Sequence, residues 1–440
     1  MLIYNAKILT NDSQNPVIDD GAIWIENGLI KAIGAGDQLK AAYTGDERVD
    51  LGGRILMPGL INMHTHIYSA FARGMGVPRP QRNFPEILEN VWWHLDRDLT
   101  ADDGRLNAYA TGIESIRNGV TTLFDHHSSP NEARGSLFAI SDALSALGMR
   151  HSLCYEVSDR DGEAIFVDEV AENMDYMRSL DPDDNMRKAM FGLHASFTLS
   201  DKSLDKVQDA MSGRREGYHI HVAEGISDQT DSLQKYGKRV VERLNDRGMI
   251  GPNSLSIHCV NTNAFEHDIL AATKANVVHN PMSNMGNAVG CTPVVAMLAK
   301  GVLVGLGTDA YTNCMLESVK VAKILQSHHL ADPTKGFGEA LTLQFENNPK
   351  MASSFFGIEL GRLVEGAAAD LITLDYKPYT PLTANTVGGH LVFGMTGRQV
   401  VDTMVNGRFV MKDRVIQTVD EDKLFAESDG RAREVWRTQL

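Results

Sequence analysis

The chain has 440 residues, of which 43% are hydrophobic and 22% are charged. This composition is typical of a globular protein and excludes disordered, collagen-like and coiled-coil chains. Asp and Glu (57) outnumber Lys and Arg (42), so the formal net charge is −15. The acidic balance argues against a nucleic-acid partner or an anionic membrane surface, because both are bound through clustered basic side chains.

The sequence contains no apolar run long enough for a transmembrane helix, and its first residues lack the form of a secretory signal. Its four cysteines are Cys154, Cys259, Cys291 and Cys314, and they show no paired spacing. We therefore expect no disulfide framework and a reducing, cytoplasmic location.

The two ends of the chain have the texture of short β-strands. Asn27-Gly28 and Asn406-Gly407 are strong signals for two-residue hairpin turns, and each lies between two short apolar runs. We predict that residues 1–56 and 359–440 together form one small discontinuous β-sandwich domain. The larger domain between them then spans residues 57–358.

The middle of the chain alternates short apolar strands with longer helical stretches. Continuous apolar runs such as residues 301–307 are expected of parallel strands that are buried on both faces. Eight strands with intervening helices predict a TIM-like (β/α)8 barrel, an α/β fold. An open doubly wound sheet would alternate in the same way, but no G-x-G-x-x-G motif opens the first helix. The predicted strand ends are His64, Asp125, Tyr155, His194, His221, His258, His279 and Asp309.

Metal-competent side chains occur at several of these strand ends, which in a barrel form the catalytic face. His64 and His66 follow the first strand, and residues two apart on a strand face the same way. Two imidazoles directed into one site suit a divalent metal such as zinc. Two histidines on a polar loop are an equally good interpretation of this motif alone.

His221 ends a later strand, and Glu224 follows in the loop, where it can reach a metal-bound water without being a ligand. His219 shares the face of His221 one layer deeper, and we interpret it as a hydrogen-bonded core histidine. His258 ends the next strand. Asp309 ends an apolar, glycine-rich strand, where a buried carboxylate needs a metal or a histidine partner. A helix N-cap is the alternative for Asp309.

In this order and at these strand ends, the residues resemble the amidohydrolase superfamily over essentially the whole chain. Five segments carry the resemblance: the first is similar to the superfamily's entry into the barrel, and the other four are similar to its aminohydrolase branch, which holds guanine, cytosine and S-adenosylhomocysteine/methylthioadenosine deaminases and triazine hydrolases. These segments are residues 57–66, 192–195, 279–284, 305–310 and 361–370. Residues 66–75 and 154–159 resemble the SsnA-type aminohydrolases, whose substrate the resemblance does not fix.

The resemblance implies that His64, His66, His221 and Asp309 bind one divalent metal ion per chain, with Zn²⁺ expected first and Fe²⁺ or Mn²⁺ as alternatives. Two-metal relatives use a carboxylated lysine from the fourth strand, and that strand ends here at His194 without one. A one-metal site is therefore expected. By analogy with the branch, the chain is also expected to form a homodimer or a larger homo-oligomer.

The expected reaction is hydrolysis at an amidine-like ring carbon of a nitrogen heterocycle, with purines among the candidate rings and ammonia as product. Glu224 would protonate the ring nitrogen, while His258 and Asp309 would orient the water and take its proton. A ring-opening hydrolase of a cyclic amide or amidine would use the same residues. A non-catalytic binding scaffold is the third alternative, but such a protein is expected to have lost its metal ligands.

The small-molecule substrate is expected to meet residues on the loop after the first strand and near other strand ends. Trp93 and Asp96 lie on that loop, and a tryptophan could stack on a flat heterocycle or anchor the loop. His194 is a substrate contact by the resemblance, and His126 follows the second strand. Arg160 lies just past the third strand and is a candidate for binding an acidic or carbonyl-rich substrate. A surface arginine is an equally good interpretation.

Overall fold

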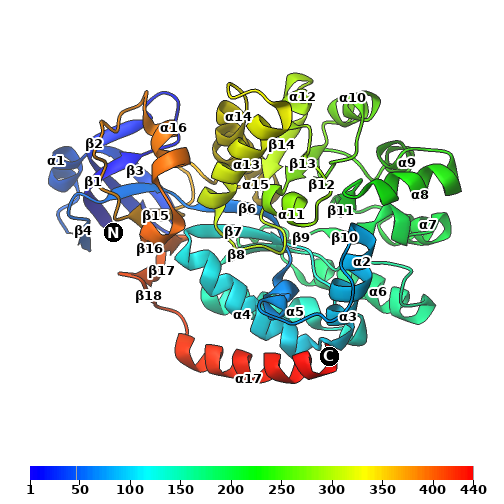
Figure 1. The fold of residues 1–440 in the computed structure, drawn as a ribbon. Helices are drawn as coiled ribbons and strands as arrows, with labels where there is room; N and C mark the ends of the chain where they lie inside the picture. Colours follow the sequence, from blue (N-terminus) through cyan, green and yellow to red (C-terminus); the bar gives the residue numbers. More distant parts are fainter. Residues whose placement is uncertain (46, 440) are drawn as a thin grey trace.

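A computed structural model describes residues 1–45 and 47–439 of the chain. A sheet built from both ends of the chain stands beside a larger α/β unit (Figure 1). Within the described residues this sheet has nine strands, in the order β18-β17-β16-β15-β5-β1-β2-β3, with β4 beside β1. The strands are β1 (Leu2–Leu9), β2 (Val17–Glu26), β3 (Leu29–Ala35), β4 (Arg48–Asp50), β5 (Ile55–Pro58), β15 (Leu371–Leu374), β16 (Val400–Val405), β17 (Arg408–Lys412) and β18 (Val415–Ile416).

Strand β5 pairs with β15 in antiparallel register, which joins the two ends of the chain in one sheet. Both predicted Asn-Gly hairpins are confirmed, between β2 and β3 and between β16 and β17. Asn27 and Asn406 have φ angles of 53° and 49°, which Asn and Gly adopt readily in such turns. The domain boundaries at 56/57 and 358/359 stay predictions.

Side chains from both halves of this sheet share one apolar cluster, which includes Ile3, Ile23, Leu56, Leu371 and Met404. Neither half could bury this face alone, since a sheet needs an apolar partner on at least one side. A buried ion pair connects the sheet to the larger unit, because the guanidinium of Arg150 contacts the carboxylate of Asp370 at 3.1 Å through both Nε and Nη2.

The larger unit contains two parallel sheets that together follow the strand order of a (β/α)8 barrel. One sheet has the strand order β6-β7-β8-β9 and the other β10-β11-β12-β13-β14. Only Met190 separates β9 from β10, so the chain passes directly from one sheet into the other. An isolated parallel bridge pairs Thr65 at the end of β6 with Asp309 beyond β14. The strands are β6 (Leu60–Thr65), β7 (Val120–Asp125), β8 (Arg150–Leu153), β9 (Arg187–Ala189), β10 (Phe191–Ala195), β11 (Tyr218–Val222), β12 (Leu255–His258), β13 (Asn276–His279) and β14 (Leu303–Leu306).

Two strands end earlier than predicted. Strand β8 ends at Leu153 and β14 at Leu306, whereas the sequence pattern placed these ends at Tyr155 and Asp309. Both later residues form isolated bridges and not a regular ladder. The backbone of Asp309 is left-handed, with φ at 57°, so extended pairing cannot continue through it.

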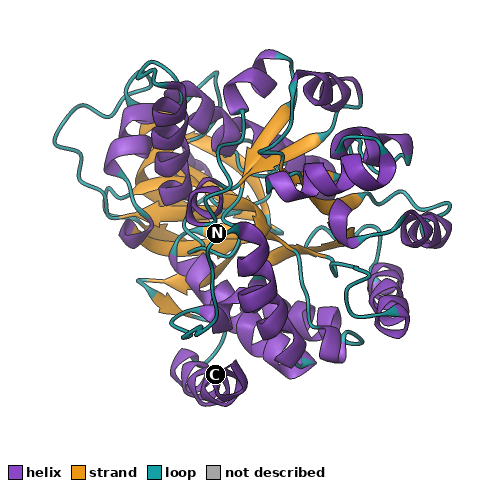
Figure 2. Ribbon diagram, turned by 45° about the vertical axis from the view of Figure 1, so that its right-hand side comes forward, coloured by secondary structure: helices purple, strands orange, loops and turns teal. Residues whose placement is uncertain are grey.

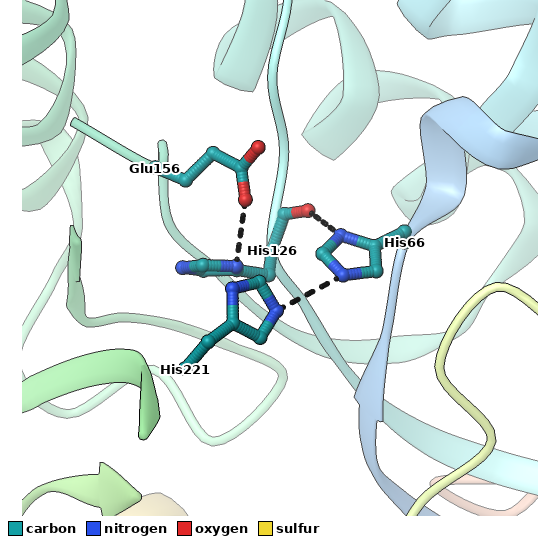
Figure 3. Close-up of side chains that lie close together, drawn as sticks. All are labelled: His66, His126, Glu156 and His221. Atoms are coloured by element: carbon teal, nitrogen blue, oxygen red, sulfur yellow. Dashed lines mark hydrogen bonds and ion pairs between the residues drawn. The ribbon is translucent and has the colours of Figure 1, made fainter. Parts of the chain in front are cut away.

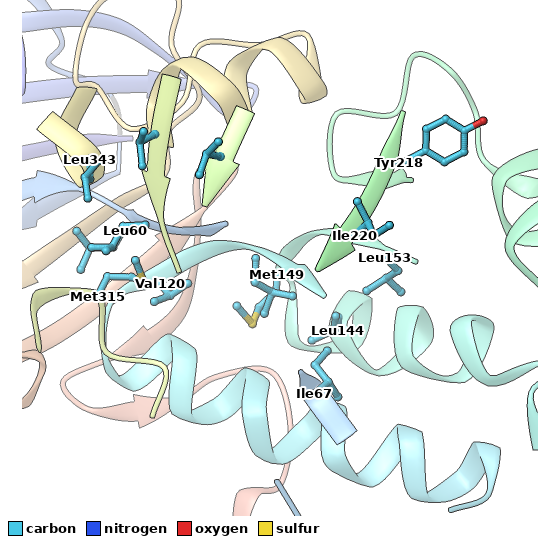
Figure 4. Close-up of a cluster of buried hydrophobic side chains, with 14 of the residues drawn as sticks. Leu60, Ile67, Val120, Leu144, Met149, Leu153, Tyr218, Ile220, Met315 and Leu343 are labelled. Atoms are coloured by element: carbon cyan, nitrogen blue, oxygen red, sulfur yellow. The ribbon is translucent and has the colours of Figure 1, made fainter. Parts of the chain in front are cut away.

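Helices surround the parallel strands (Figure 2). Leu60 and Val120 on the strands pack with Leu144 of α5 and Met315 of α13 in the main apolar cluster (Figure 4). The helices that follow or connect these strands are α4 (Ala101–Arg117), α5 (Ser136–Leu147), α6 (Glu163–Ser179), α7 (Asp201–Ala210), α8 (Ile226–Tyr236), α9 (Val240–Asp246), α10 (Ala264–Ala272), α11 (Pro281–Gly286), α12 (Val294–Ala299), α13 (Met315–Leu330), α14 (Phe337–Leu341) and α15 (Asn348–Phe356).

The remaining helices follow β3, lie in the loop after β6, lie between β15 and β16, or end the described chain. They are α1 (Gly36–Ala42), α2 (Phe84–Ile87), α3 (Trp93–Leu95), α16 (Val387–Gly389) and α17 (Glu421–Gln439). Helix α17 packs along α4 (Figure 1), and Arg431 on it forms a bidentate ion pair with the buried carboxylate of Asp103. Within residues 1–45 and 47–439, no helix combines the length and apolar character that crossing a membrane requires.

Candidate active site

Histidine and carboxylate side chains from several strand ends converge on one point of the barrel. The potential ligand atoms of His64, His66 and Asp309 lie within 4.8 Å of one another, and so do those of His64, His221 and His258. All five side chains are buried. The structure therefore brings together the four predicted metal ligands and the predicted catalytic His258.

Backbone carbonyls fix the tautomers of two of these imidazoles. Nδ1 of His66 donates to the carbonyl oxygen of His126 at 2.6 Å, and Nδ1 of His221 donates to that of His194 at 2.9 Å. In a neutral imidazole the other nitrogen, Nε2, then carries only a lone pair. The two Nε2 atoms lie 3.2 Å apart (Figure 3), a repulsive arrangement unless a cation or a proton lies between them.

His64 also offers an unused nitrogen. Its Nδ1 lies 2.9 Å from Nε2 of His219, while its own Nε2 is buried and has no hydrogen-bond partner among the described residues. Burial lowers the pKa of His64, of His66 and of His221, so these imidazoles stay neutral, as metal ligands must.

Asp309 completes the donor set. Its Oδ1 lies 3.4 Å from Nε2 of His66, and its Oδ2 lies 3.4 Å from Nε2 of His258. Position 307, two residues earlier, requires a glycine, because a Cβ there would lie 2.8 Å from the carbonyl oxygen of His64. Three imidazole nitrogens and one carboxylate are a ligand set that suits zinc, and iron or manganese would also fit. The residues present therefore fit one divalent ion.

Several residues at this end of the barrel have a strained backbone. Ala223, His258 and Asp309 have φ angles of 48°, 69° and 57°. These values lie in the left-handed region, which residues other than Gly and Asn rarely adopt. Such positions persist only where the surrounding structure holds them, and they gather at functional sites. Here the turns redirect the chain where the strands end, beside the candidate ligands.

Glu224 lies between the cluster and the pocket. Its Oε2 is 3.4 Å from Nε2 of His258, and its Oε1 accepts a hydrogen bond from Asn287 at 3.1 Å. Burial, and then the charge of Asp309, raise the pKa of Glu224 well above its ordinary value. A carboxyl group in this environment keeps its proton near neutral pH and can donate it. His258 is oriented by Asn284, whose Oδ1 lies 2.8 Å from Nδ1.

A pocket opens onto this cluster, and His66, His221, Glu224 and Asp309 form part of its wall. Its outer wall is the helical stretch 84–98 that follows β6, which includes a π-helical turn over Leu88–Trp92. The pocket-facing side chains of this stretch are Phe84, Leu88, Trp92 and Trp93. These apolar and aromatic surfaces favour a flat ring as the ligand.

Two of the five predicted substrate contacts line the pocket. His194 and Trp93 face it, with ring centroids 6.0 Å apart, and Nδ1 of His194 is held by the hydroxyl of Thr198 at 2.8 Å. Asp96 and Arg160 are ion-paired with each other behind that wall, and the Arg160 guanidinium lies 5.4 Å from the centre of the Trp93 ring.

His126 is fully buried beside the ligand cluster, and burial lowers its pKa to about 3. Its side chain is absent from the lining of this pocket, as are those of Asp96 and Arg160. Substrate contact by any of the five residues stays a prediction.

Sequence reasoning missed Glu156. Glu156 lines the pocket, and burial raises the pKa of its carboxyl group to about 8. The available signal was a carboxylate just past a barrel strand, the same signal that marked Asp309. His219 is a buried, hydrogen-bonded histidine, as its sequence pattern predicted, and its partner is the candidate ligand His64. Its spacing of two from His221 indicated the shared face but not this contact.

Comparison with known proteins extends these observations. Residues 55–410 match the model of the amidohydrolase family. The chain is 32% identical over 441 residues to a 5′-deoxyadenosine deaminase of Methanosarcina mazei, covering 99% of this chain and 98% of that protein. It is 29% identical over 442 residues to a 5-methylthioadenosine/S-adenosylhomocysteine deaminase of Syntrophomonas wolfei, covering 99% of both.

A solved structure has the same fold at low sequence identity. It is an adenosine deaminase from Xanthomonas campestris with bound zinc, which superposes with a TM-score of 0.86 at 22% identity and covers 99% of this chain and 98% of that one. The family match spans most of the chain, including the predicted metal ligands and Glu224. The protein is therefore a member of the amidohydrolase family.

Proposed function

We propose that the protein is a metal-dependent aminohydrolase that replaces an amino group on a ring carbon of a nitrogen heterocycle with oxygen and releases ammonia. The observation that carries this proposal is the position of Glu224. Its carboxyl group, whose pKa burial raises, lies beside His258 and the predicted ligands, at the inner end of a pocket with aromatic walls.

His64, His66, His221 and Asp309 would hold one divalent ion per chain, with zinc as the first choice. Such an ion supplies Lewis acidity, which lowers the pKa of a bound water from about 16 to roughly 7. The buried Nε2 of His64, which lacks a partner among the described residues, and the opposed Nε2 atoms of His66 and His221 support this assignment.

Asp309, His258 and Glu224 would accept and donate the protons of the reaction. Asp309 and His258, 3.4 Å apart, would orient the attacking water and accept its proton. Glu224 would donate a proton to the ring nitrogen next to the attacked carbon, which draws electrons away from that carbon. The amino group then leaves as ammonia, so the net reaction consumes one water and yields a ring carbonyl.

Adenosine-type nucleosides are the first substrates to test. The relatives described above are named as deaminases of 5′-deoxyadenosine and of 5-methylthioadenosine or S-adenosylhomocysteine. A purine ring would lie between the pocket's aromatic side chains and direct its amino-bearing carbon toward the ligand cluster. Ring opening of a cyclic amide would use the same residues, and it is distinguished by the loss of the ring.

A homo-oligomeric state and a cytoplasmic location accompany this proposal as predictions from the family resemblance and the cysteine pattern. Size-exclusion chromatography with light scattering would test the first prediction, with a dimer or larger assembly as the expected result.

The proposal is tested by ammonia release. Purified zinc-loaded protein is incubated with adenosine, 5′-deoxyadenosine, guanine, cytosine, pterins and aminotriazines, with chelator-treated protein as the matched control. We expect ammonia and an intact ring that carries a carbonyl in place of the amino group from at least one of these compounds, and no activity after the metal is removed. Zinc-loaded, folded protein that releases no ammonia from any of them would contradict the proposal, as would a ring-opened product.

A further inference from the structure

Asp228 is a buried carboxyl group of the pocket wall to which the mechanism assigns no role. It lies in the first turn of helix α8, shortly after Glu224 in the chain. Its two oxygens accept hydrogen bonds from two different loops. Oδ2 accepts from the backbone N–H of Ala223 at 2.9 Å, and Oδ1 accepts from that of Phe197 at 3.0 Å. One carboxylate therefore joins the loop after β11 to the loop after β10.

Helix capping does not account for these contacts. A carboxylate at this position of a capping box accepts from the backbone N–H of the N-cap residue, which here is Gly225. Asp228 instead reaches back to Ala223, outside the helix, and across to Phe197, which is 31 residues away in the chain. Phe197 lines the pocket and Ala223 immediately precedes Glu224, so both contacts concern the candidate active site.

Ala223 needs an anchor of this kind because its backbone is left-handed, with φ at 48°. Crowding between Cβ and the backbone disfavours this conformation for every residue with a side chain. The turn at Ala223 brings Glu224 to the pocket wall, where Oε1 of Glu224 accepts a hydrogen bond from Asn287 at 3.1 Å. If Ala223 relaxed to an ordinary φ, the direction of the chain at Glu224 would change.

The same turn is held on its other side by Asn261, which follows β12. The backbone N–H of Asn261 donates to the carbonyl oxygen of Ala223 at 2.9 Å, and its side-chain amide donates to that of Glu224 at 2.6 Å. These bonds fix the peptide group after Ala223, whereas Asp228 binds the N–H of the peptide group before it. Without Asp228 the turn would stay attached to the barrel but would lose a bond that maintains its φ.

The pocket wall at Phe197 has an anchor of its own. The guanidinium of Arg243, which is buried on helix α9, donates to the carbonyl oxygens of Ser196 and Leu199 at 2.8 Å each. Phe197 lies between these two residues in the chain. Loss of Asp228 should therefore disturb the turn at Ala223 more than the wall at Phe197.

We propose that Asp228 is a positioning residue that directs Glu224 into the pocket by holding Ala223 in its left-handed conformation and tying it to the loop of Phe197. This inference rests on the proposed function, because it takes Glu224 as the proton donor. Both oxygens of Asp228 are occupied by backbone N–H groups, so it acts through Glu224 and not on the substrate. Its loss should slow proton transfer and leave ring binding nearly unchanged.

The first test compares Asp228→Ala with Asp231→Ala, using the best substrate of the ammonia assay. Burial raises the pKa of Asp228 to about 7, so the assay is run at pH 8, where most of this carboxyl group is ionised. We expect kcat of zinc-loaded Asp228→Ala to fall by roughly 10-fold, with KM changed by less than about 3-fold. Asp231 is the matched control because it lies on the same helix, pairs with Lys235 at 2.7 Å and does not line the pocket.

A glycine at position 223 provides a readout that a general loss of structure would not restore. Glycine adopts a left-handed backbone without crowding, so it needs the anchor less than alanine does. Adding Ala223→Gly to Asp228→Ala should therefore recover about 3-fold or more of the lost kcat. If Asp228→Ala does not fold, Asp228→Asn replaces it in both comparisons, because its amide oxygen offers one acceptor in place of two.

A kcat near the wild-type value in folded, zinc-loaded Asp228→Ala would overturn the inference. A rise in KM alone would also overturn it, as Asp228 would then be a substrate contact, and so would a double variant without recovery. The proposed function fails separately, if wild-type protein releases no ammonia from any ring. Crystal structures of the zinc-loaded proteins then decide. In Asp228→Ala we expect Ala223 to lose its positive φ and Glu224 its bond to Asn287, and an unchanged turn would contradict the inference.

Discussion

Nδ1 of His64 lies 2.9 Å from Nε2 of His219, so the imidazole nearest the barrel core is oriented by a second histidine below it. For Nε2 of His64 to bind a cation, its proton must be on Nδ1, and His64 then donates to His219. A partner of this kind fixes both the tautomer and the direction of a ligand. The candidate metal site thus includes a histidine one layer deeper in the barrel than the predicted ligands.

We expect His219→Ala to weaken zinc binding by about 10- to 100-fold while the fold persists. The reason is that His64 loses the acceptor that holds its proton on Nδ1. Competition with a zinc chelator measures the affinity, and His267→Ala is the control, because His267 is a histidine of helix α10 whose Nε2 contacts only the hydroxyl of Thr262. Equal zinc affinity in His219→Ala and wild-type protein would show that the contact does not orient His64.

The convergence of the predicted metal ligands could be expected from the sequence, because the family resemblance named them and barrel geometry brings the ends of its strands to one face. His64, His66, His221 and Asp309 follow different strands, and parallel strands of a barrel deliver their carboxyl ends to one face. Residues two apart on a strand share a side, which paired His64 with His66. The Asn-Gly turns revealed the hairpins for an equally local reason, since only a few residues tolerate a positive φ.

The pocket wall was less predictable, because its parts depend on tertiary packing. Asp96 and Arg160 are 64 residues apart in the chain and neutralise each other behind Trp93, which no local pattern indicates. Glu156 was not identified, because a single carboxylate after a strand is usually solvated. Helix α17 lies against the loop after β6, so the loop's conformation depends on residues at the far end of the chain.

The ion pairs made by two arginines of helix α17 differ in burial. Arg431 reaches the fully buried carboxylate of Asp103, at 2.7 and 3.0 Å, whereas Arg433 and Asp429 pair with each other on the surface. We expect Arg431→Met to lower the free energy of unfolding by about 1–2 kcal/mol, a value that allows for the partial exposure of the arginine. Urea unfolding measures the change.

Arg433→Met on the same helix is the control, and its effect should stay within about 0.5 kcal/mol because both partners are solvated. Equal losses of unfolding free energy in the two variants would contradict the importance of the buried contact.

Asp125 makes stability depend on pH. Burial raises the pKa of its carboxyl group from the ordinary 3.8 to about 8, although the backbone N–H of Ile67 donates a hydrogen bond to Oδ1; Oδ2 has no partner among the described residues. The folded state therefore binds a proton that the unfolded chain releases near pH 4. This contribution to stability is full below that pH and is lost as the pH rises through about 8.

We expect the melting temperature of wild-type protein to fall between pH 6 and pH 9, and the fall to be smaller for Asp125→Asn, because the amide stays neutral throughout. Thermal unfolding followed by circular dichroism gives both curves. Parallel curves for the two proteins would mean that Asp125 does not bind the extra proton.

The most direct test of the account compares Glu224→Gln with His221→Ala, using the best substrate that the ammonia assay identifies. Glutamine has nearly the shape of glutamate but cannot donate a proton as an acid, so ammonia release per bound zinc should fall by roughly 100-fold or more with the zinc retained. His221→Ala removes a ligand and should lose zinc itself. Near-normal turnover in Glu224→Gln would contradict the account, and zinc loss from that folded variant would make Glu224 a ligand.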